Sequence, residues 1–246
     1  FGCDECLNGE KLIWDPVKPL GCKCPESNYA GQISEQCPLA LDFFGDTVNQ
    51  YGISTGSPQE LESITACFWM SVPEAYVKDR RVNFISYASS NSPNDFLLVL
   101  RPSLDLLMKN TVYSTNVHLA DGKLHHVCVT WKSLGGQFKV YKDGALVKTM
   151  DNIKSGEKFN AGGIWVIGQD QDSLGDGFQT GDSYKGILTE VNIWNEILHF
   201  DVIKHFANDY GLPVRGNYKA YSDFVISSAT ELIKPSCCPL APLPEA

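Results

Sequence analysis

The sequence has no long hydrophobic run and no excess of basic residues, and both absences exclude classes of function. Its apolar runs are short, such as residues 96–100, and are too short to span a bilayer. The 20 Lys and Arg are outnumbered by 29 Asp and Glu, which gives a formal net charge of −9. Nucleic-acid binding depends on clustered basic residues that neutralise phosphates. We therefore expect neither a transmembrane segment nor a nucleic-acid partner.

A catalytic pattern is also missing. Glycosidases flank the sugar with paired carboxylates, and those with a β-jelly-roll fold carry three acids on one strand as Glu-x-Asp-x-x-Glu. No such run occurs here. His125 and His126 are adjacent, and neighbouring side chains on a strand face opposite sides. We expect one of them to face the core and the other to be exposed, and we predict that the protein is not an enzyme.

The nine cysteines indicate an oxidising compartment. Seven lie near the two ends, in Pro- and Gly-rich sequence too short to build a core: Cys3, Cys6, Cys22, Cys24, Cys37, Cys237 and Cys238. This usage is typical of a secreted, extracellular protein, and so is a chain that begins with Phe rather than Met. The alternative for the first four is a tetrahedral zinc site, although the spacing of the second pair differs from that of common zinc knuckles.

Composition divides the chain into three regions. Residues 1–37 are Cys-rich, residues 38–225 carry regular strand signals, and residues 226–246 have the composition of an extended C-terminal tail. Strand patterns cover 65–72, 82–88, 125–131, 138–144, 163–168 and 186–194. One helix is expected from Asp201, as its N-cap, to Ala207. Many strands with one short helix predict an all-β, two-sheet jelly-roll sandwich.

Several motifs of the middle region resemble, in order along the chain, those of the pentraxin family. Residues 126–131 have the form His-x-Cys-x-Thr-Trp, after Cys67 in Ala-Cys-Phe-Trp. A Lys-Asp-Gly hairpin at 142–144 follows, then Ile-Gly-Gln-Asp-Gln-Asp-Ser-Leu-Gly at 167–175 and Val-Asn-Ile-Trp at 191–194. The resemblance implies a concanavalin- or laminin-G-like sandwich. It also implies a disulfide between Cys67 and Cys128, which the residues alone leave open, because two separate buried thiols are the alternative.

The acidic stretch Asp170-Gln171-Asp172 has two interpretations. Carboxylates that lie two residues apart in an extended segment project to the same side and repel each other. A hard divalent cation bound between them balances their negative charges. The alternative is a solvated acidic turn. An EF-hand is excluded, because position twelve of the loop is Gly181 instead of Glu.

The pentraxin resemblance favours Ca²⁺ and implies two neighbouring ions. Asp170 and Asp172 would bridge both ions, Gln171 would donate its backbone carbonyl, and Gln179 and Asp182 would complete the outer ion. Gln179 stands where the family has a Glu. One negative charge fewer weakens the attraction for Ca²⁺.

The family's second calcium-binding segment maps onto residues 92–95. Asn94 fits the family pattern, but Pro93 stands where the family has an Asp. With a shift of one residue along the chain, Asp95 would supply the missing carboxylate. We therefore expect a lower calcium affinity than in members with the full ligand set, and the outer ion is the more weakly supported of the two.

These features predict a secreted, calcium-dependent, lectin-like binding protein of pentraxin type. Its ligand would be phosphocholine, phosphoethanolamine or a carbohydrate, whose oxygens complete the metal shell. The alternative is a disulfide-crosslinked structural or adhesive extracellular protein that uses the domain as a building block. A third possibility is a module of a larger receptor.

The odd number of cysteines predicts assembly. Setting aside Cys67 and Cys128 leaves seven, so at least one thiol is free or bonded to another chain. Cys237 and Cys238 are adjacent, and a disulfide between neighbours strains the peptide that joins them, so they are candidates for intersubunit bonds. The resemblance implies rings of five. We expect a disulfide-linked homo-oligomer.

Overall fold

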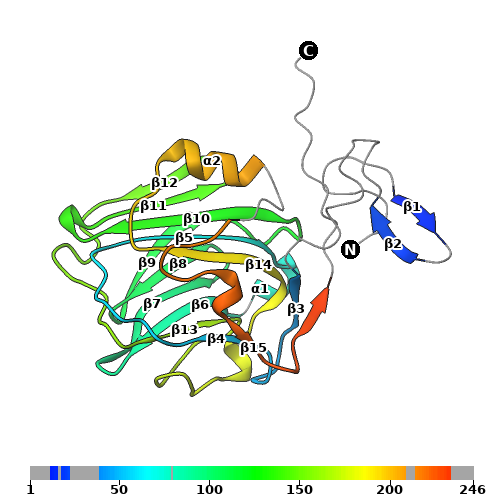
Figure 1. Cartoon of the computed structure of the whole chain (residues 1–246), viewed down its shortest axis with the longest axis horizontal. Coiled ribbons are helices and arrows are strands. Elements are labelled where there is room, and N and C mark those ends of the chain that lie inside the picture. The colour runs from blue at the N-terminus through cyan, green and yellow to red at the C-terminus, as the bar shows by residue number, and fades with distance from the viewer. Residues whose placement is uncertain (1–11, 16–17, 23–38, 79, 209–213, 234–246) are drawn as a thin grey trace, which may run out of the picture.

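Two seven-stranded antiparallel sheets lie face to face in the part of the chain that the computed structural model describes, residues 12–15, 18–22, 39–78, 80–208 and 214–233 (Figure 1). The predicted all-β, two-sheet jelly-roll sandwich is confirmed. A separate two-stranded sheet pairs β1 (Leu12–Asp15) with β2 (Lys18–Cys22). The helices of the described residues are too short to cross a bilayer.

The first sheet has the strand order β12-β11-β10-β5-β14-β3-β16. Its strands are β12 (Ala145–Met150), β11 (Gln137–Lys142), β10 (His125–Lys132), β5 (Ser63–Ser71), β14 (Lys185–Trp194), β3 (Ala40–Phe44) and β16 (Glu231–Ile233).

The second sheet has the order β15-β4-β13-β6-β7-β8-β9. Its strands are β15 (Val225–Ile226), β4 (Gly52–Ser54), β13 (Ile164–Ile167), β6 (Val82–Ser89), β7 (Ser92–Leu100), β8 (Leu104–Met108) and β9 (Thr111–Val117). The helices are α1 (Glu74–Val77) and α2 (Phe200–Asn208), with 3-10 turns η2 (Leu134–Gly136), η3 (Thr180–Asp182) and η4 (Tyr221–Asp223).

The six predicted strand patterns coincide with β5, β6, β10, β11, β13 and β14. The predicted helix is α2, which begins one residue before Asp201, so that Asp201 lies in its first turn. Paired structure also continues beyond residue 225, because β16 adds to β3 at the edge of the first sheet. The segment in which the sequence predicts an extended tail therefore contributes a strand to the sandwich.

The main core fills the space between the sheets with aromatic and branched side chains. Trp165 on β13 stacks on Tyr87 of β6, with ring centroids 4.6 Å apart. Trp131 is 1% exposed and donates its indole N–H to the carbonyl of Ile153, 2.8 Å away. A buried indole thus has its polar atom satisfied, as the burial of such a group requires. Trp131 is a core residue, as predicted.

A smaller cluster lies on the outer face of the first sheet, beneath α2 (Figure 1). Its buried members are Cys67, Cys128, Tyr141, Trp194 and Ile203, the last from α2 itself. Cys67 on β5 and Cys128 on β10 are directly opposite each other in the register, with Cα atoms 4.1 Å apart, and form the predicted disulfide. Trp194 packs here and not between the sheets.

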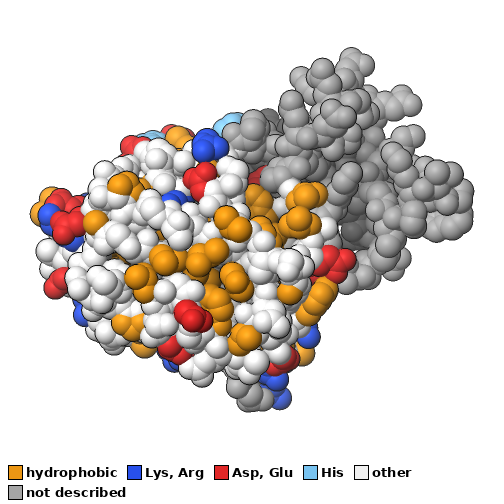
Figure 2. Space-filling view, turned by 60° about the horizontal axis from the view of Figure 1, so that its bottom comes forward, with side chains coloured by type: hydrophobic (Ala, Val, Ile, Leu, Met, Phe, Trp, Pro, Cys, Tyr) orange, Lys and Arg blue, Asp and Glu red, His pale blue; other side chains and the backbone are white. Residues whose placement is uncertain are grey.

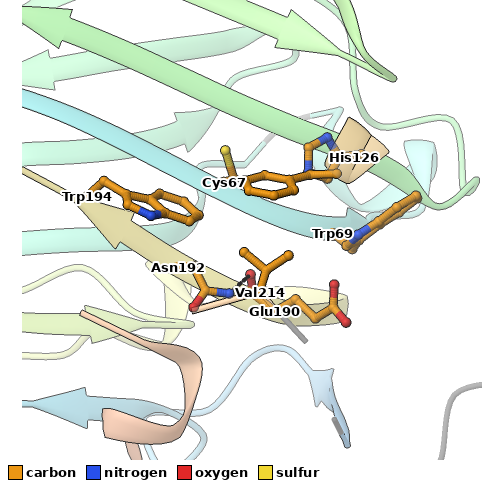
Figure 3. Close-up of a pocket in the computed structure, with 8 residues that line it drawn as sticks. Cys67, Trp69, His126, Glu190, Asn192, Trp194 and Val214 are labelled. Carbon is orange, nitrogen blue, oxygen red and sulfur yellow. Dashed lines mark hydrogen bonds between the residues drawn. The ribbon is translucent and has the colours of Figure 1, made fainter. Parts of the chain in front are cut away.

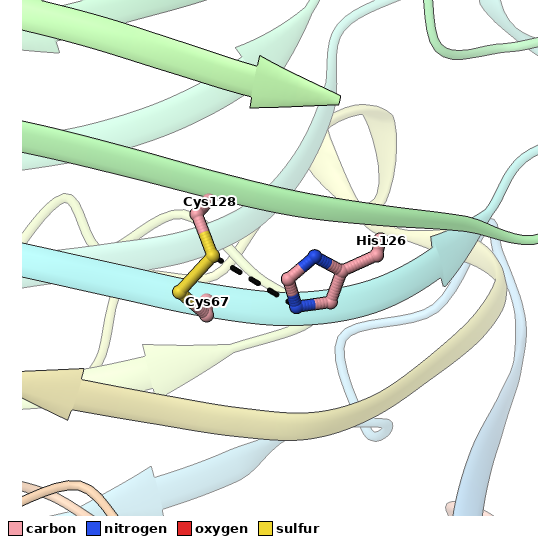
Figure 4. A group of neighbouring side chains, drawn as sticks. All are labelled: Cys67, His126 and Cys128. Carbon is pink, nitrogen blue, oxygen red and sulfur yellow. Dashed lines mark hydrogen bonds between the residues drawn. A yellow bond between two sulfur atoms is a disulfide. The ribbon is translucent and has the colours of Figure 1, made fainter. Parts of the chain in front are cut away.

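Both adjacent histidines are buried, so the expectation that one is exposed is wrong. His126 is 2% exposed and lies against the disulfide, with Nε2 3.8 Å from Cys128 Sγ (Figure 4). The cluster beneath α2 covers this outer face, which the strand alternation alone does not reveal. His125 faces the other way, and its ring lies between two carboxylates: Asp143 at 2.7 Å and Asp121 at 3.0 Å.

Removing the disulfide should lower stability without changing the fold. Replacing Cys67 and Cys128 together by Ala should reduce the free energy of unfolding by about 4 kcal/mol, because the bridge closes a long loop in the unfolded chain. The loop separates the two cysteines by 61 positions. Urea unfolding under non-reducing conditions measures the change. A loss below about 1 kcal/mol would contradict this account of the bridge.

His126 should make the fold sensitive to acid. Burial lowers its pKa from 6.5 to about 4, against a smaller opposing effect of Asp143. Below pH 6.5 this histidine is therefore protonated in the unfolded chain, but it stays neutral in the folded chain until the pH approaches 4. The free energy of unfolding consequently falls as the pH falls toward 4. His126 alone should contribute a loss of about 2 kcal/mol between pH 7 and pH 5, while His125 and Asp170, whose pKa values the fold raises, oppose this loss.

Urea unfolding at the two pH values tests this loss. Relative to wild type, His126→Gln should gain about 2 kcal/mol of stability between pH 7 and pH 5, whatever its effect on stability at pH 7. His205→Gln is the matched control, because His205 is exposed on α2, and it should retain the wild-type dependence. An unchanged dependence in His126→Gln would assign the acid sensitivity to other groups.

Candidate metal centre

The acidic loop follows β13, at the point where the chain leaves the second sheet. Gly168 makes the exit possible: its φ is +87°, and the ring of Phe43 lies 2.2 Å from where a Cβ would be. Only glycine combines that backbone conformation with so close an approach. The backbone N–H of Gly168 donates to Phe84 of β6, and its carbonyl accepts from Tyr184. The loop is therefore tied at both ends.

Gln171 fastens the loop to the sheet through its side chain. The buried amide donates from Nε2 to the backbone carbonyls of Ser86 (3.2 Å) and Ile164 (3.0 Å). Its Oε1 accepts the N–H of Gly175 at 2.9 Å. The side chain is thus fully used in holding the loop, which leaves only the backbone carbonyl of Gln171 for the ligand role predicted from the resemblance.

Asp170 and Asp182 come together beside Arg81, which directly precedes β6. Asp170 is 6% exposed, and its Oδ2 lies 3.4 Å from Nη2 of Arg81. The Oδ1 of Asp182 lies 3.7 Å from Nε of the same guanidinium. Asn83 on β6 supports this arrangement by donating its side-chain amide to the backbone carbonyl of Asp182, 2.8 Å away.

Arg81 balances the charge of the Asp170 carboxylate only in part. Burial raises its pKa to about 6; Arg81 lowers it, and the charges of Asp182 and Asp172 raise it again. Its Oδ1 is buried and accepts no hydrogen bond from the residues that the structure describes. A buried carboxylate oxygen without a partner is costly, and it fits a position where a cation binds.

Asp172 and Gln179 lie on the exposed side of the loop. The amide of Gln179 donates to Oδ2 of Asp172, so these two predicted ligands are in contact. Reciprocal backbone hydrogen bonds between Ser173 and Asp176 close the turn that brings them together. The predicted ligands of this loop therefore lie in two pairs: Asp172 contacts Gln179, and Arg81 connects Asp170 with Asp182. Among the described residues, these carboxylates do not come within 4.8 Å of one another as a group of three.

Asn94 and Asp95 contact a different set of residues. Asn94 lies in β7 and donates to Oδ1 of Asn110 at 3.3 Å. The buried carboxylate of Asp95 accepts from Asn160 at 2.9 Å and lies 3.9 Å from Lys109 Nζ. These partners give Asp95 a structural role at the ends of β7 and β8. The proposed substitution of Asp95 for a family acid remains a prediction from the sequence.

Calcium fits the donor set of the loop. Ca²⁺ takes carboxylate, amide and backbone carbonyl oxygens, and the loop supplies all three kinds from Asp170, Asp172, Asp182, Gln179 and Gln171. The unpartnered Oδ1 of Asp170 points to the same conclusion. By contrast, the Cys67, His126 and Cys128 group cannot act as a thiolate metal site, because its two sulfurs are joined to each other.

Sequence reasoning missed Arg81 and Asn83. The signal that could have found them is strand pairing: Ile167 of β13 lies opposite Ile85 of β6, and the antiparallel register runs from there toward the start of β6. Residues that follow β13 therefore emerge beside the residues that begin β6. Nothing in the local sequence around Arg81 indicates that partner.

Two other features carry no substrate site. Residues 52–56 have the Gly-x-Ser-x-Gly spacing of a hydrolase elbow, but Ser54 is 3% exposed within the paired strand β4 and not at a strand-to-helix turn. A cavity of about 10 Å³ beside α2 is lined by aromatic side chains and by His126 and Glu190 (Figure 3). Its volume suits one water molecule and no sugar or headgroup.

Three of the four cysteines of the alternative zinc site, and the two C-terminal cysteines, lie outside the described residues. Cys3, Cys6, Cys24, Cys37, Cys237 and Cys238 fall outside the described residues, and Cys22 is the last residue of β2.

Comparison with known proteins agrees with this architecture. The model of the Pentaxin family matches residues 46–221. The chain is 30% identical over 194 residues to C-reactive protein 1.1 of Limulus polyphemus, covering 71% of this chain and 78% of that protein. It also superimposes on the native heptameric SAP-like pentraxin of Limulus polyphemus with a TM-score of 0.71 and 25% identity, covering 81% of this chain and 97% of that one.

A longer protein is also similar. The chain is 33% identical over 191 residues to the rat "Sushi, von Willebrand factor type A, EGF and pentraxin domain-containing protein 1", covering 75% of this chain. The chain spans only 5% of the length of that relative. The family match covers most of the chain, and the same region forms most strands of the two-sheet sandwich and the acidic loop. This chain therefore belongs to the pentraxin family of binding proteins.

Proposed function

We propose that this protein binds its ligand through calcium held by the loop that joins β13 to β14. The observation that carries the proposal is Asp170, a buried carboxylate with an unpartnered Oδ1 and with Asp172 and Asp182 as electrostatic neighbours. Three acids on one loop repel one another, and the single positive charge of Arg81 balances them only in part. A divalent cation would remove that repulsion and satisfy the unpartnered oxygen.

The residues around the loop would have distinct roles. Asp170, Asp172 and Asp182 would supply carboxylate oxygens, Gln179 a side-chain oxygen and Gln171 its backbone carbonyl. Gln171 and Asn83 hold the loop on β6 by hydrogen bonds, so little ordering remains to be done when an ion binds. When bound, the ion would offer open coordination positions to oxygens of a ligand.

The ligand classes that suit such a site are anionic or hydroxyl-rich. Phosphocholine, phosphoethanolamine and carbohydrates all present oxygens that bind a hard cation. A binding role without catalysis agrees with membership of this family. Secretion into an oxidising compartment belongs to the same proposal, and the Cys67–Cys128 bridge supports it.

We also propose that the protein forms a homo-oligomer. The solved relative from Limulus polyphemus is heptameric, and hydrophobic side chains gather in the middle of the face shown in Figure 2. Exposed large apolar residues of the described chain include Phe44 (53%), Val225 (72%) and Leu232 (50%). Exposed apolar surface of this kind is typical of protein–protein contacts. Whether disulfides of Cys237 and Cys238 link the subunits is a prediction from the sequence.

Calcium should stabilise the fold. An ion that binds only the native state adds about 2.7 kcal/mol at a hundredfold excess over its Kd. For a chain of this size that corresponds to a rise in Tm of about 5–10 °C. Thermal unfolding in millimolar calcium and in chelator measures the rise. The calcium proposal fails if the two melting temperatures coincide.

Two variants of the same loop separate a metal ligand from a surface acid. Asp172→Asn should lose most of the calcium-dependent rise in Tm. Asp176→Asn changes the same charge at another exposed loop position, where Oδ1 accepts the N–H of Gly177, and should keep the rise. Equal losses in both variants would indicate a general charge effect and not a specific ligand.

Ligand binding should require calcium. Immobilised phosphocholine, phosphoethanolamine and a glycan array should retain the protein in calcium and release it in chelator, because the ligand's oxygens complete the metal shell. Asp172→Asn should bind weakly and Asp176→Asn normally. Equal retention in chelator would instead favour the crosslinked structural or adhesive function. Hydrolysis of a glycan on the array would contradict a purely binding role.

A further inference from the structure

Arg81 places a positive charge within the group of predicted calcium ligands. Its guanidinium reaches two acids at once, with Nη2 3.4 Å from Asp170 Oδ2 and Nε 3.7 Å from Asp182 Oδ1. The Asp170 side chain is 7% exposed and the Asp182 side chain 18%, so both carboxylates are shielded from water. Arg81 therefore acts as their counter-ion in the structure described here.

The neighbouring arginine shows that this placement is particular to Arg81. Arg80 turns to Asp46 and lies over the ring of Tyr76, with its guanidinium carbon 4.9 Å from the ring centroid. Consecutive residues at the start of β6 thus point in different directions, as side chains of an extended chain do. Only the second of the two faces the acidic loop.

A calcium ion that bridged Asp170 and Asp182 would lie close to Arg81, whichever oxygen of Asp170 it bound, because the two oxygens belong to one carboxylate that already faces the guanidinium. Calcium–oxygen bonds are about 2.3–2.6 Å long, shorter than the distances from Arg81 to the same carboxylates. An ion bridging Asp170 and Asp182 would therefore come close to the guanidinium, and two cations in that space repel each other. The Arg81 side chain is 40% exposed, so it has a route outward into solvent.

We propose that Arg81 is a built-in competitor of calcium, which holds the acidic loop together without the ion and must move aside when the ion binds. This inference rests on the proposed function of the loop. Arg81 lowers the apparent affinity, because calcium binds tightly only to the fraction of molecules in which the guanidinium has withdrawn. In return, it balances the loop's negative charge when calcium is scarce. Arg81 thus sets the calcium concentration at which the site fills.

Removing the guanidinium should have opposite effects on the free and the calcium-loaded protein. Arg81→Gln should lower Tm in chelator, because Asp170 and Asp182 then lose their counter-ion. It should also tighten the calcium Kd about tenfold, because the competing charge is gone. Titration of chelator-stripped protein with calcium, followed by isothermal calorimetry and by Tm, measures both effects. Arg81→Lys keeps a charge and should fall between wild type and Arg81→Gln.

Lys158→Gln is the control for loss of a paired positive charge. Lys158 Nζ lies 2.7 Å from Glu62 Oε1, and its side chain is 46% exposed, which is similar to the 40% of Arg81. It precedes β13, whereas the acidic loop follows that strand. This variant should leave both the calcium Kd and the calcium-dependent rise in Tm unchanged.

The outcomes separate this inference from the proposed function. Tighter binding by Arg81→Gln supports both, including the case in which only the variant binds calcium measurably. A calcium Kd equal to that of wild type, or weaker, overturns the role of Arg81 while leaving the calcium site intact. Absence of any calcium response in wild type and in Arg81→Gln overturns the proposed function and this inference with it.

Discussion

The pairing of β13 with β6 decides where the acidic loop lies and what surrounds it. With Ile167 opposite Ile85, the chain leaves β13 beside the first residues of β6. Asp170 is thereby buried next to Arg81, and Gln171 is brought over Ser86. The grouping of charges depends on this backbone register more than on any single side chain. A shift of one residue would reverse which side chains face the loop.

The positions of the strands could be predicted because their signals are local, and the disulfide could be predicted because the family resemblance implies it. Alternating β-branched and aromatic runs mark β5, β6 and β10, and Cys67 and Cys128 each lie in an apolar strand. The burial of His126 could not be predicted, because it depends on α2 covering the outer face of the first sheet. Strand β16 was hidden for a similar reason: three residues pair with β3 from far along the chain.

The candidate site also combines residues that local sequence can identify with residues that only the fold brings to the loop. Asp170, Gln171 and Asp172 are close in sequence, so their motif could identify them, and the loop also brings Gln179 to Asp172. Arg81 and Asn83 reach the loop only through the fold, 80 to 100 positions away. The ligand roles of Asn94 and Asp95 stay predictions from the family resemblance. Their observed contacts are with Lys109 and Asn110, between β8 and β9, and with Asn160, between β12 and β13, and these contacts also depend on the fold.

The bond between Cys67 and Cys128 joins two neighbouring strands of the first sheet, but the chain between them forms β6, β7, β8 and β9 of the second. Four of the seven strands of that sheet therefore belong to one covalently closed ring. A protease that cuts any turn within the ring leaves both new ends attached through sulfur. A single backbone cut within the ring would then release no fragment until the bridge is reduced, so that cleavage of the chain and loss of a fragment are separate events for this domain.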